Sequence, residues 1–263
     1  PAASSASAAA APPDIDTRAI GSVLRTGATS RTVELAIGTK VTAGAFTRAK
    51  LVAPVGEAQT GEPYVLDLEL EQGSLSVESG YVDRMDWPSA VQVSVARAGQ
   101  FACAIDFEGA CAFDVEVAAD GAGRVRATSG AAFRYLGRAE TLSFFGAMEI
   151  PAGAVIELYP DPRRPSGTPH FASASPFFQV ALRAWDLDRD DAALGIVLRE
   201  ARRQDSLTLY FLGVESPVAR ERVAFRLEQL VPGRQYADED WKMHDYRTKL
   251  HQILSNLLSN ACK

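Results

Sequence analysis

Two segments of this sequence hold polar side chains whose types and spacing could do chemistry. The first, Trp185–Asp191, contains four aspartates in the seven residues WDLDRDD. Clustered carboxylates in a loop provide the oxygen ligands that a calcium ion prefers. The second lies near the C-terminal end, where Asn256 and Asn260 stand four positions apart. On a helix this spacing places both amides on one face, where they can share a metal ion and its waters.

The segment Met243–Lys263, MHDYRTKLHQILSNLLSNACK, resembles the N box of sensor histidine kinases, in which a helix with two asparagines lines the ATP pocket. The resemblance implies that Asn260 binds magnesium and that Asn256 is its polar neighbour one turn earlier. It also implies that Lys263 faces the phosphates. A nucleotide-binding fragment related to these kinases is therefore one hypothesis. The alternative is a helix that only packs, because an amphipathic helix needs a surface for its apolar face.

Two segments are similar to C2 domains, the β-sandwiches that bind calcium and lipid. Gly61–Val65, GEPYV, is similar to the GxSDPYV segment of that family, and Trp185–Gly195 looks like its WDxDR loop. The resemblance implies peripheral contact with a membrane and a calcium site, for which the candidate ligands are Asp186, Asp188, Asp191 and Glu62. The alternative is that these acidic residues only form solvated turns.

Other patterns typical of enzymes and metal sites are absent from the sequence. It contains no GxSxG, HExxH, P-loop or GxGxxG motif. Its three cysteines and three histidines do not have the paired spacing of a zinc site. We therefore predict a non-catalytic protein whose only candidate cofactor is calcium, apart from the nucleotide that the N-box resemblance implies.

Charge and hydropathy limit the classes of partner. The chain has 27 Lys and Arg against 33 Asp and Glu, which gives a net charge of −6. An acidic protein without a basic cluster is not expected to bind nucleic acid, because phosphate contacts need a basic surface. No apolar run reaches the roughly 18 residues that a membrane-spanning helix requires. We predict a soluble, acidic protein whose partners are other protein subunits.

The chain opens with an uncharged segment, Pro1–Pro13, that is rich in alanine, serine and proline. Such a composition buries little apolar surface, so we expect a flexible tail. The first residue is Pro1 rather than methionine, which indicates that a preceding segment was removed. Removal of a targeting segment for an organelle or a cell envelope would explain this start, as would the way the chain was produced, so the compartment stays open.

Alternating apolar and polar residues predict strands along most of the chain. The clearest example is Phe101–Val117, FACAIDFEGACAFDVEV, which we interpret as a core hairpin with a three-residue loop that places Phe107 opposite Cys111. A strand is also predicted at Pro63–Glu71, followed by a turn at Gln72 and Gly73. Further strands are predicted at Ala90–Arg97, Arg124–Thr128, Ala132–Leu136, Ala154–Tyr159, Phe177–Trp185, Gly195–Ala201 and Ser206–Val214, and a turn at Asp120–Gly123. Ala219–Leu230 fits a strand or a short helix, and Val223, Phe225 and Leu227 favour the strand.

The pattern changes to helical spacing near the C-terminus. From Asp238 to Lys263 the apolar residues recur every three or four positions, which predicts an amphipathic helix. The expected fold class is mainly β, an antiparallel β-sandwich or two packed sheets with a C-terminal amphipathic α-helix. The expected organisation is a tail at 1–13, a β-rich body at 14–233 with a subdomain break near 160–170, and the helix at 234–263.

The leading functional prediction is a non-catalytic structural or interaction subunit of a larger assembly. The uncharged tail and the amphipathic helix would be its docking elements, because neither segment has an evident place in a β body. The C2-like calcium- or lipid-binding module and the nucleotide-binding fragment are the alternatives.

Overall fold

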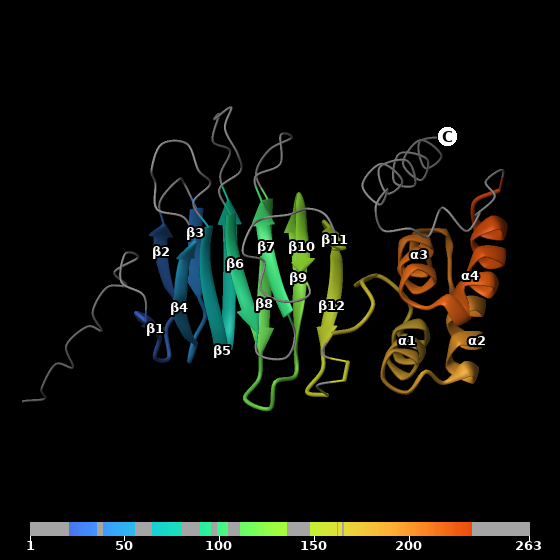
Figure 1. The fold of residues 1–263 in the computed structure, drawn as a ribbon, viewed down its shortest axis with the longest axis horizontal. Helices are drawn as coiled ribbons and strands as arrows, with labels where there is room; N and C mark the ends of the chain where they lie inside the picture. The colour runs from blue at the N-terminus through green and yellow to red at the C-terminus, as the bar shows by residue number, and fades with distance from the viewer. Residues whose placement is uncertain are drawn as a thin grey trace, which may run out of the picture.

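The computed structural model describes residues 21–35, 39–55, 65–79, 90–95, 99–104, 111–135, 148–161, 163–164 and 166–232. Within these ranges the chain first forms strands and then four α-helices, which lie beside the β body (Figure 1). The strands are β1 Val23–Arg25, β2 Arg31–Leu35, β3 Thr39–Ala43, β4 Arg48–Val55, β5 Val65–Ser79, β6 Ala90–Val95, β7 Gly99–Ala104, β8 Cys111–Val117, β9 Gly123–Ser129, β10 Ala131–Tyr135, β11 Met148–Pro151, β12 Ala154–Leu158 and β13 His170–Phe171.

The strand β5 joins the two halves of the β body. Its first half pairs with β4 and β6, and its second half, from Gly73 onward, pairs with β3 and β8. The turn predicted at Gln72 and Gly73 is therefore wrong, because the strand continues through both residues. Gly73 has a φ of +93°, and a Cβ atom there would lie 2.5 Å from Thr47 Cα. Glycine is needed at this point, because the chain changes sheets where two backbones approach closely.

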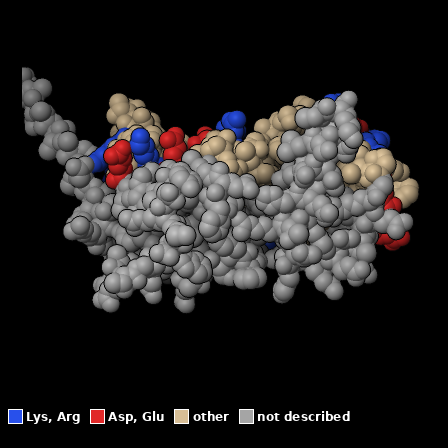
Figure 2. Space-filling model, turned by 90° about the horizontal axis from the view of Figure 1, so that it is seen from above, with Lys and Arg blue, Asp and Glu red and all other residues tan. Residues whose placement is uncertain are grey.

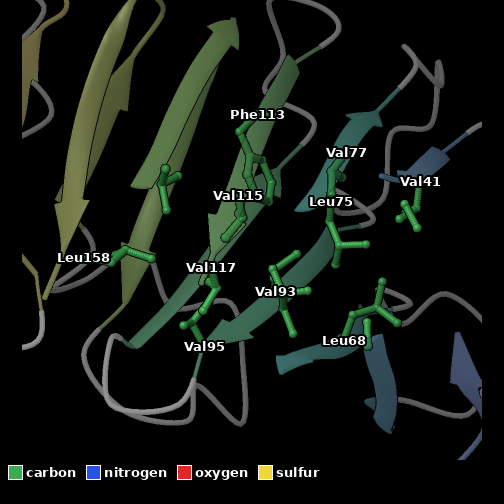
Figure 3. Close-up of a cluster of buried hydrophobic side chains, with 14 of the residues drawn as sticks. Val41, Leu68, Leu75, Val77, Val93, Val95, Phe113, Val115, Val117 and Leu158 are labelled. Carbon is green, nitrogen blue, oxygen red and sulfur yellow. The ribbon is translucent and has the colours of Figure 1, made fainter. Parts of the chain in front are cut away.

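The strands follow one continuous hydrogen-bonded path, β11-β10-β7-β6-β5-β8-β9-β12-β13, with β4 and β1 attached to one half and β3 and β2 to the other. Among the strands that the structure describes, every pairing is antiparallel except that of β5 with β6. The two halves enclose one apolar core, in which side chains from β5, β6 and β8 lie close together (Figure 3). This arrangement confirms the predicted mainly antiparallel β fold class.

The predicted hairpin over Phe101–Val117 is wrong. β7 pairs with β6 and β10, whereas β8 pairs with β5 and β9, so the two strands belong to different halves of the body. Phe107, which was expected to face Cys111, lies outside the described residues. Period-2 alternation shows that one face of a strand is buried, but it does not select the neighbour that the strand pairs with. Both strand segments were correctly predicted, and only their pairing was not.

The predicted strands at Phe177–Trp185, Gly195–Ala201 and Ser206–Val214 are also wrong, because these segments form helices. Ala219–Leu230 forms the helix that was the alternative, and not the strand that its pattern favoured. The helices are α1 Pro176–Asp188, α2 Asp191–Glu200, α3 Ser206–Glu215 and α4 Pro217–Leu230. In α1 the residues Phe178, Leu182 and Trp185 are buried while Val180 is exposed, which is the spacing of a helix and not of a strand. The side chain of Ser175 accepts a hydrogen bond from the backbone N–H of Phe178 and caps the helix.

Helix pairs α1/α2 and α3/α4 enclose a second apolar core. In α3 every residue from Ser206 to Gly213 is buried, so its sequence shows no periodicity. In α4 the buried residues are Ala219, Val223 and Leu227, whereas Phe225, which suggested a strand, points outward. The β-rich part thus ends at β13, before residue 233. The predicted helix at 234–263 and the tail at 1–13 lie outside the described residues.

Candidate functional site

The acidic segment Trp185–Asp191 lies at the turn between α1 and α2, and its first aspartate is buried. Asp186 is 1% exposed, and both of its carboxylate oxygens have partners. Oδ2 accepts a hydrogen bond from the backbone N–H of Thr168 at 2.8 Å. Oδ1 accepts one from Thr168 Oγ1 at 2.7 Å and pairs with Arg164 Nη2 at 2.8 Å. Asp186 therefore holds the segment before α1 against that helix.

Arg164 also reaches a second helix. Its Nη2 atom lies 3.0 Å from Glu215 Oε2 at the end of α3, so one guanidinium binds two carboxylates. Burial, followed by the charge of Asp186, raises the pKa of the neighbouring Tyr159 hydroxyl well above its ordinary value. Gly167 packs against this group so closely that a Cβ atom would lie 2.8 Å from Tyr159 Oη. The side chains of Tyr159, Arg164, Thr168, Asp186 and Glu215, with the backbone next to them, form a polar cluster whose role is structural.

The other two aspartates of the predicted calcium site face different surroundings. Asp188 is exposed at the last residue of α1. Asp191 is the first residue of α2, where its carboxylate forms an ion pair with Arg222 of α4. The part of the chain that the structure describes contains no group of three or more His, Cys, Asp or Glu side chains placed to hold a metal ion. Calcium binding stays a prediction, to be tested by titration.

The remaining predicted site residues lie outside the described ranges. These are Asn256, Asn260 and Lys263 of the N-box segment and Glu62 of the C2-like segment.

A second buried acid is also structural. Asp205 is 1% exposed, and its Oδ2 atom accepts a hydrogen bond from the backbone N–H of Arg202 at 2.8 Å. Burial raises the pKa of this carboxyl group, and the hydrogen bond from Arg202 opposes that effect. The Nδ1 atom of His170 lies 3.3 Å from the carbonyl oxygen of Thr168. These groups fix the turn before α3.

Sequence reasoning missed the partners of Asp186. Arg164 and Thr168 precede Asp186 by 22 and 18 positions, and Glu215 follows Arg164 by 51 positions, so no local pattern connects these residues. A polar residue at a core position of a helix is rare and needs partners, and this was the only signal that could have indicated the contacts of Asp186. It was missed because the segment was predicted to be a strand followed by a loop.

The surface features with the clearest functional meaning are exposed apolar side chains on the helices. Among the described residues, the large hydrophobic side chains that are exposed are Phe46, Phe177, Val180, Val218 and Phe225. All except Phe46 belong to α1 or α4. Exposed apolar groups that recur on one helix face are typical of protein interaction surfaces.

The exposed apolar residues of α1 form a stripe. Phe177 is 77% exposed and Val180 is 71% exposed, and the partly exposed Ala184 and Leu187 continue the series. Spacings of three, four and three positions place the four side chains on one face of the helix. We call these four residues the α1 stripe.

The outward face of α4 has a different character. Val218 is 86% exposed and Phe225 is 65% exposed, and the charged residues Glu221 and Arg222 lie between them on the same face. An open groove along α4 and the end of α2 is lined by Leu198, Ala224 and Phe225 together with charged side chains of both signs. Over the described parts of the face in Figure 2, blue and red groups also lie beside one another without a continuous patch of either sign.

None of the helices that the structure describes has both the length and the apolar character needed to cross a membrane. No protein-family model matches the chain, and no curated protein matches its sequence.

Two solved structures are similar in fold to part of the chain. Both are crystal structures of a proposed anti-sigma factor from Parabacteroides distasonis ATCC 8503, at 1.65 and 2.50 Å resolution. Each has 14% sequence identity and a TM-score of 0.37, and each alignment covers 53% of this chain. The alignments span 55% of the other chain, so about half of each protein is compared.

Proposed function

We propose that this protein is a non-catalytic interaction subunit that binds a partner protein through the α1 stripe. The observation that carries the proposal is the exposure of Phe177 and Val180, which lie three positions apart on a helix whose opposite face is buried. A soluble helix normally has one apolar face, directed to the core. On the second apolar face of α1, Ala184 packs partly against the core, whereas Phe177 and Val180 are exposed.

The spacing of the α1 stripe suits another helix or an apolar groove. Positions that alternate three and four apart are those that meet a partner helix in knobs-into-holes packing. Full burial of a phenylalanine or valine side chain contributes about 1.5 to 3 kcal/mol. Phe177 and Val180 together could therefore provide a substantial part of the free energy of binding.

The neighbouring contacts make α1 a rigid element on which to present this face. Ser175 caps its first turn, and Asp186 fixes its last turn to Thr168 and Arg164. A surface that is already ordered loses little conformational entropy when it binds. The proposal extends to the predicted docking segments 1–13 and 238–263, which would add further contacts.

The test is the native mass of the protein purified from its source, with any co-purifying chain identified. We expect a stoichiometric complex that is lost on Val180→Asp, because a buried charge without a partner opposes binding. The matched control is Phe46→Asp, which places a carboxylate at an exposed apolar side chain of the β body and should keep the partner. A complex that survives Val180→Asp, or is lost equally with both variants, would contradict a role for the α1 stripe.

Deletion of the two terminal segments tests the rest of the proposal. Separate removal of 1–13 and 238–263 should each weaken assembly if these segments dock. If neither deletion changes the native mass, they are not docking elements.

A further inference from the structure

The outward face of α4 is complementary to itself. Along one side of the helix lie Val218, the pair Glu221 and Arg222, and Phe225, all exposed. Val218 and Phe225 are seven positions apart, close to two full turns, so they share a face. The opposite face, with Ala219, Val223 and Leu227, is buried against the rest of the helical region.

We propose that this face binds a second copy of the chain, with the two α4 helices antiparallel about a twofold axis. In such an interface, if one residue of the first copy contacts a given residue of the second, the reverse contact is also made. With the axis between Glu221 and Arg222, Val218 of each copy lies opposite Phe225 of the other. The same register places each Glu221 opposite an Arg222.

Charge decides between this arrangement and a parallel one. In a parallel pairing Glu221 would face Glu221 and Arg222 would face Arg222, and like charges at a contact oppose binding. The antiparallel register replaces both repulsions with two ion pairs and still brings the apolar side chains together. The order of the charges along α4 therefore favours a second copy in the antiparallel direction.

An intramolecular contact holds Arg222 in position for this role. Its guanidinium pairs with Asp191 at the start of α2, and the Arg222 side chain is nevertheless 42% exposed. A guanidinium has five N–H donors, so it can bind Asp191 and a Glu221 from the second copy together. Asp191 thus orders the arginine before the second copy binds, which reduces the entropy lost on binding.

Sedimentation equilibrium of the full chain over a range of concentrations tests the proposal. The parent should show a reversible equilibrium between the 28.2 kDa monomer and a dimer. Phe225→Asp should abolish the dimer, because it places a carboxylate in the apolar contact. Val180→Asp on α1 should not affect it, since this inference rests on α4 alone and is independent of the α1 partner.

Charge reversal gives the sharper test. Glu221→Arg alone and Arg222→Glu alone each place like charges opposite one another, and each should raise the dissociation constant of the dimer about tenfold. An equimolar mixture of the two variants should form a heterodimer about as stable as the parent dimer, because both opposite-charge pairs are restored. If Glu221 and Arg222 did not face each other across the interface, mixing the two variants would not restore binding.

Controls separate a lost interface from a damaged fold. Arg222→Glu also breaks the pair with Asp191, so Asp191→Asn is the matched variant, and it should keep the dimer. Far-ultraviolet circular dichroism should show unchanged helix content in every variant. A parent that stays monomeric throughout, or a mixture that associates no better than the single variants, would overturn the proposal. A monomeric parent whose melting temperature falls on Phe225→Asp would show instead that its own chain covers this face.

Discussion

At the scale of single residues, the buried carboxylate of Asp186 has specific partners. Asp186 is fully enclosed, and its charge is balanced by Arg164 and by two hydrogen bonds from Thr168. A buried carboxylate is tolerated only when its oxygens are satisfied in this way. Asp186, one of the predicted calcium ligands, thus makes its contacts within the protein.

Tyr159 gives a prediction for alkaline pH. Burial, and then the charge of Asp186, raise the pKa of its hydroxyl in the folded protein, whereas an unfolded tyrosine ionises near pH ~10. Below this pH the hydroxyl is neutral in both states and the stability it provides is fully present. Above it only the unfolded chain loses the proton, so the free energy of unfolding should fall by about 1.4 kcal/mol per pH unit.

The measurement is urea unfolding of the parent and of Tyr159→Phe at several pH values on either side of pH ~10. Other groups that ionise in this range contribute equally to both proteins, so the difference isolates Tyr159. The free energy should fall less steeply in Tyr159→Phe. Parallel curves for the two proteins would show that Tyr159 ionises alike in both states.

At the scale of elements, β5 decides how the β body is built. It is the strand shared by the two halves, and the passage from one to the other occurs beside Gly73. Thr47 fixes this point, because its Oγ1 atom accepts a hydrogen bond from the backbone N–H of Ser74 and donates one to the Ser74 carbonyl. A side chain at position 73 would occupy the space that Thr47 fills.

Gly73→Ala should therefore be costly, and Gly121→Ala is its matched control. Both glycines have positive φ values, +93° and +88°, but only Gly73 has backbone close to the site of a Cβ atom. The φ penalty alone should cost Gly121→Ala about 1 to 2 kcal/mol of unfolding free energy. The additional clash should bring Gly73→Ala to about 3 kcal/mol or more.

Urea midpoints of the two variants measure this difference. Equal losses would mean that the backbone near Thr47 moves aside, and that the close approach at Gly73 is not needed for the passage between sheets.

At the scale of the whole molecule, the segment between β12 and β13 connects the β body with the helices. Its backbone is tied to β12, since the N–H of Gly167 donates a hydrogen bond to the Glu157 carbonyl at 2.8 Å. Its side chains hold the helices, because Arg164 pairs with Asp186 of α1 and with Glu215 of α3. The two apolar cores are thus coupled through a short polar segment.

Arg164→Ala should uncouple them. Removal of the arginine leaves Asp186 and Glu215 without their shared cation, and loss of one partner of a buried ion pair typically costs about 3 to 5 kcal/mol. We expect thermal unfolding followed by calorimetry to change from one transition to two, with the helical region melting first.

Arg163→Ala is the control, because the neighbouring pair with Asp161 is at the surface, where the Arg163 side chain is 86% exposed. Such exposed pairs contribute little, so a single transition should persist. Two transitions in both variants, or in neither, would contradict the coupling.

The sequence by itself determined where one face of a segment is buried. The segments of β6, β9, β10 and β12 were predicted as strands, because alternation over several residues requires a pleated, half-buried backbone. The turn over Asp120–Gly123 was predicted from turn-forming residues, and the structure shows it between β8 and β9. The absence of a catalytic motif set the expectation of an interaction protein.

Only the tertiary structure decided which segments meet. The partners of β7 and β8, the helical state of the last four segments and the ion pairs of Arg164 all depend on contacts between residues far apart in the chain. Short apolar segments such as Ser206–Val214 fit a buried strand and a buried helix equally well, because burial on all sides removes the periodicity that distinguishes them. The tertiary structure also decided which faces of α1 and α4 are exposed, because a side chain such as Phe225 is buried or exposed only once its helix has packed.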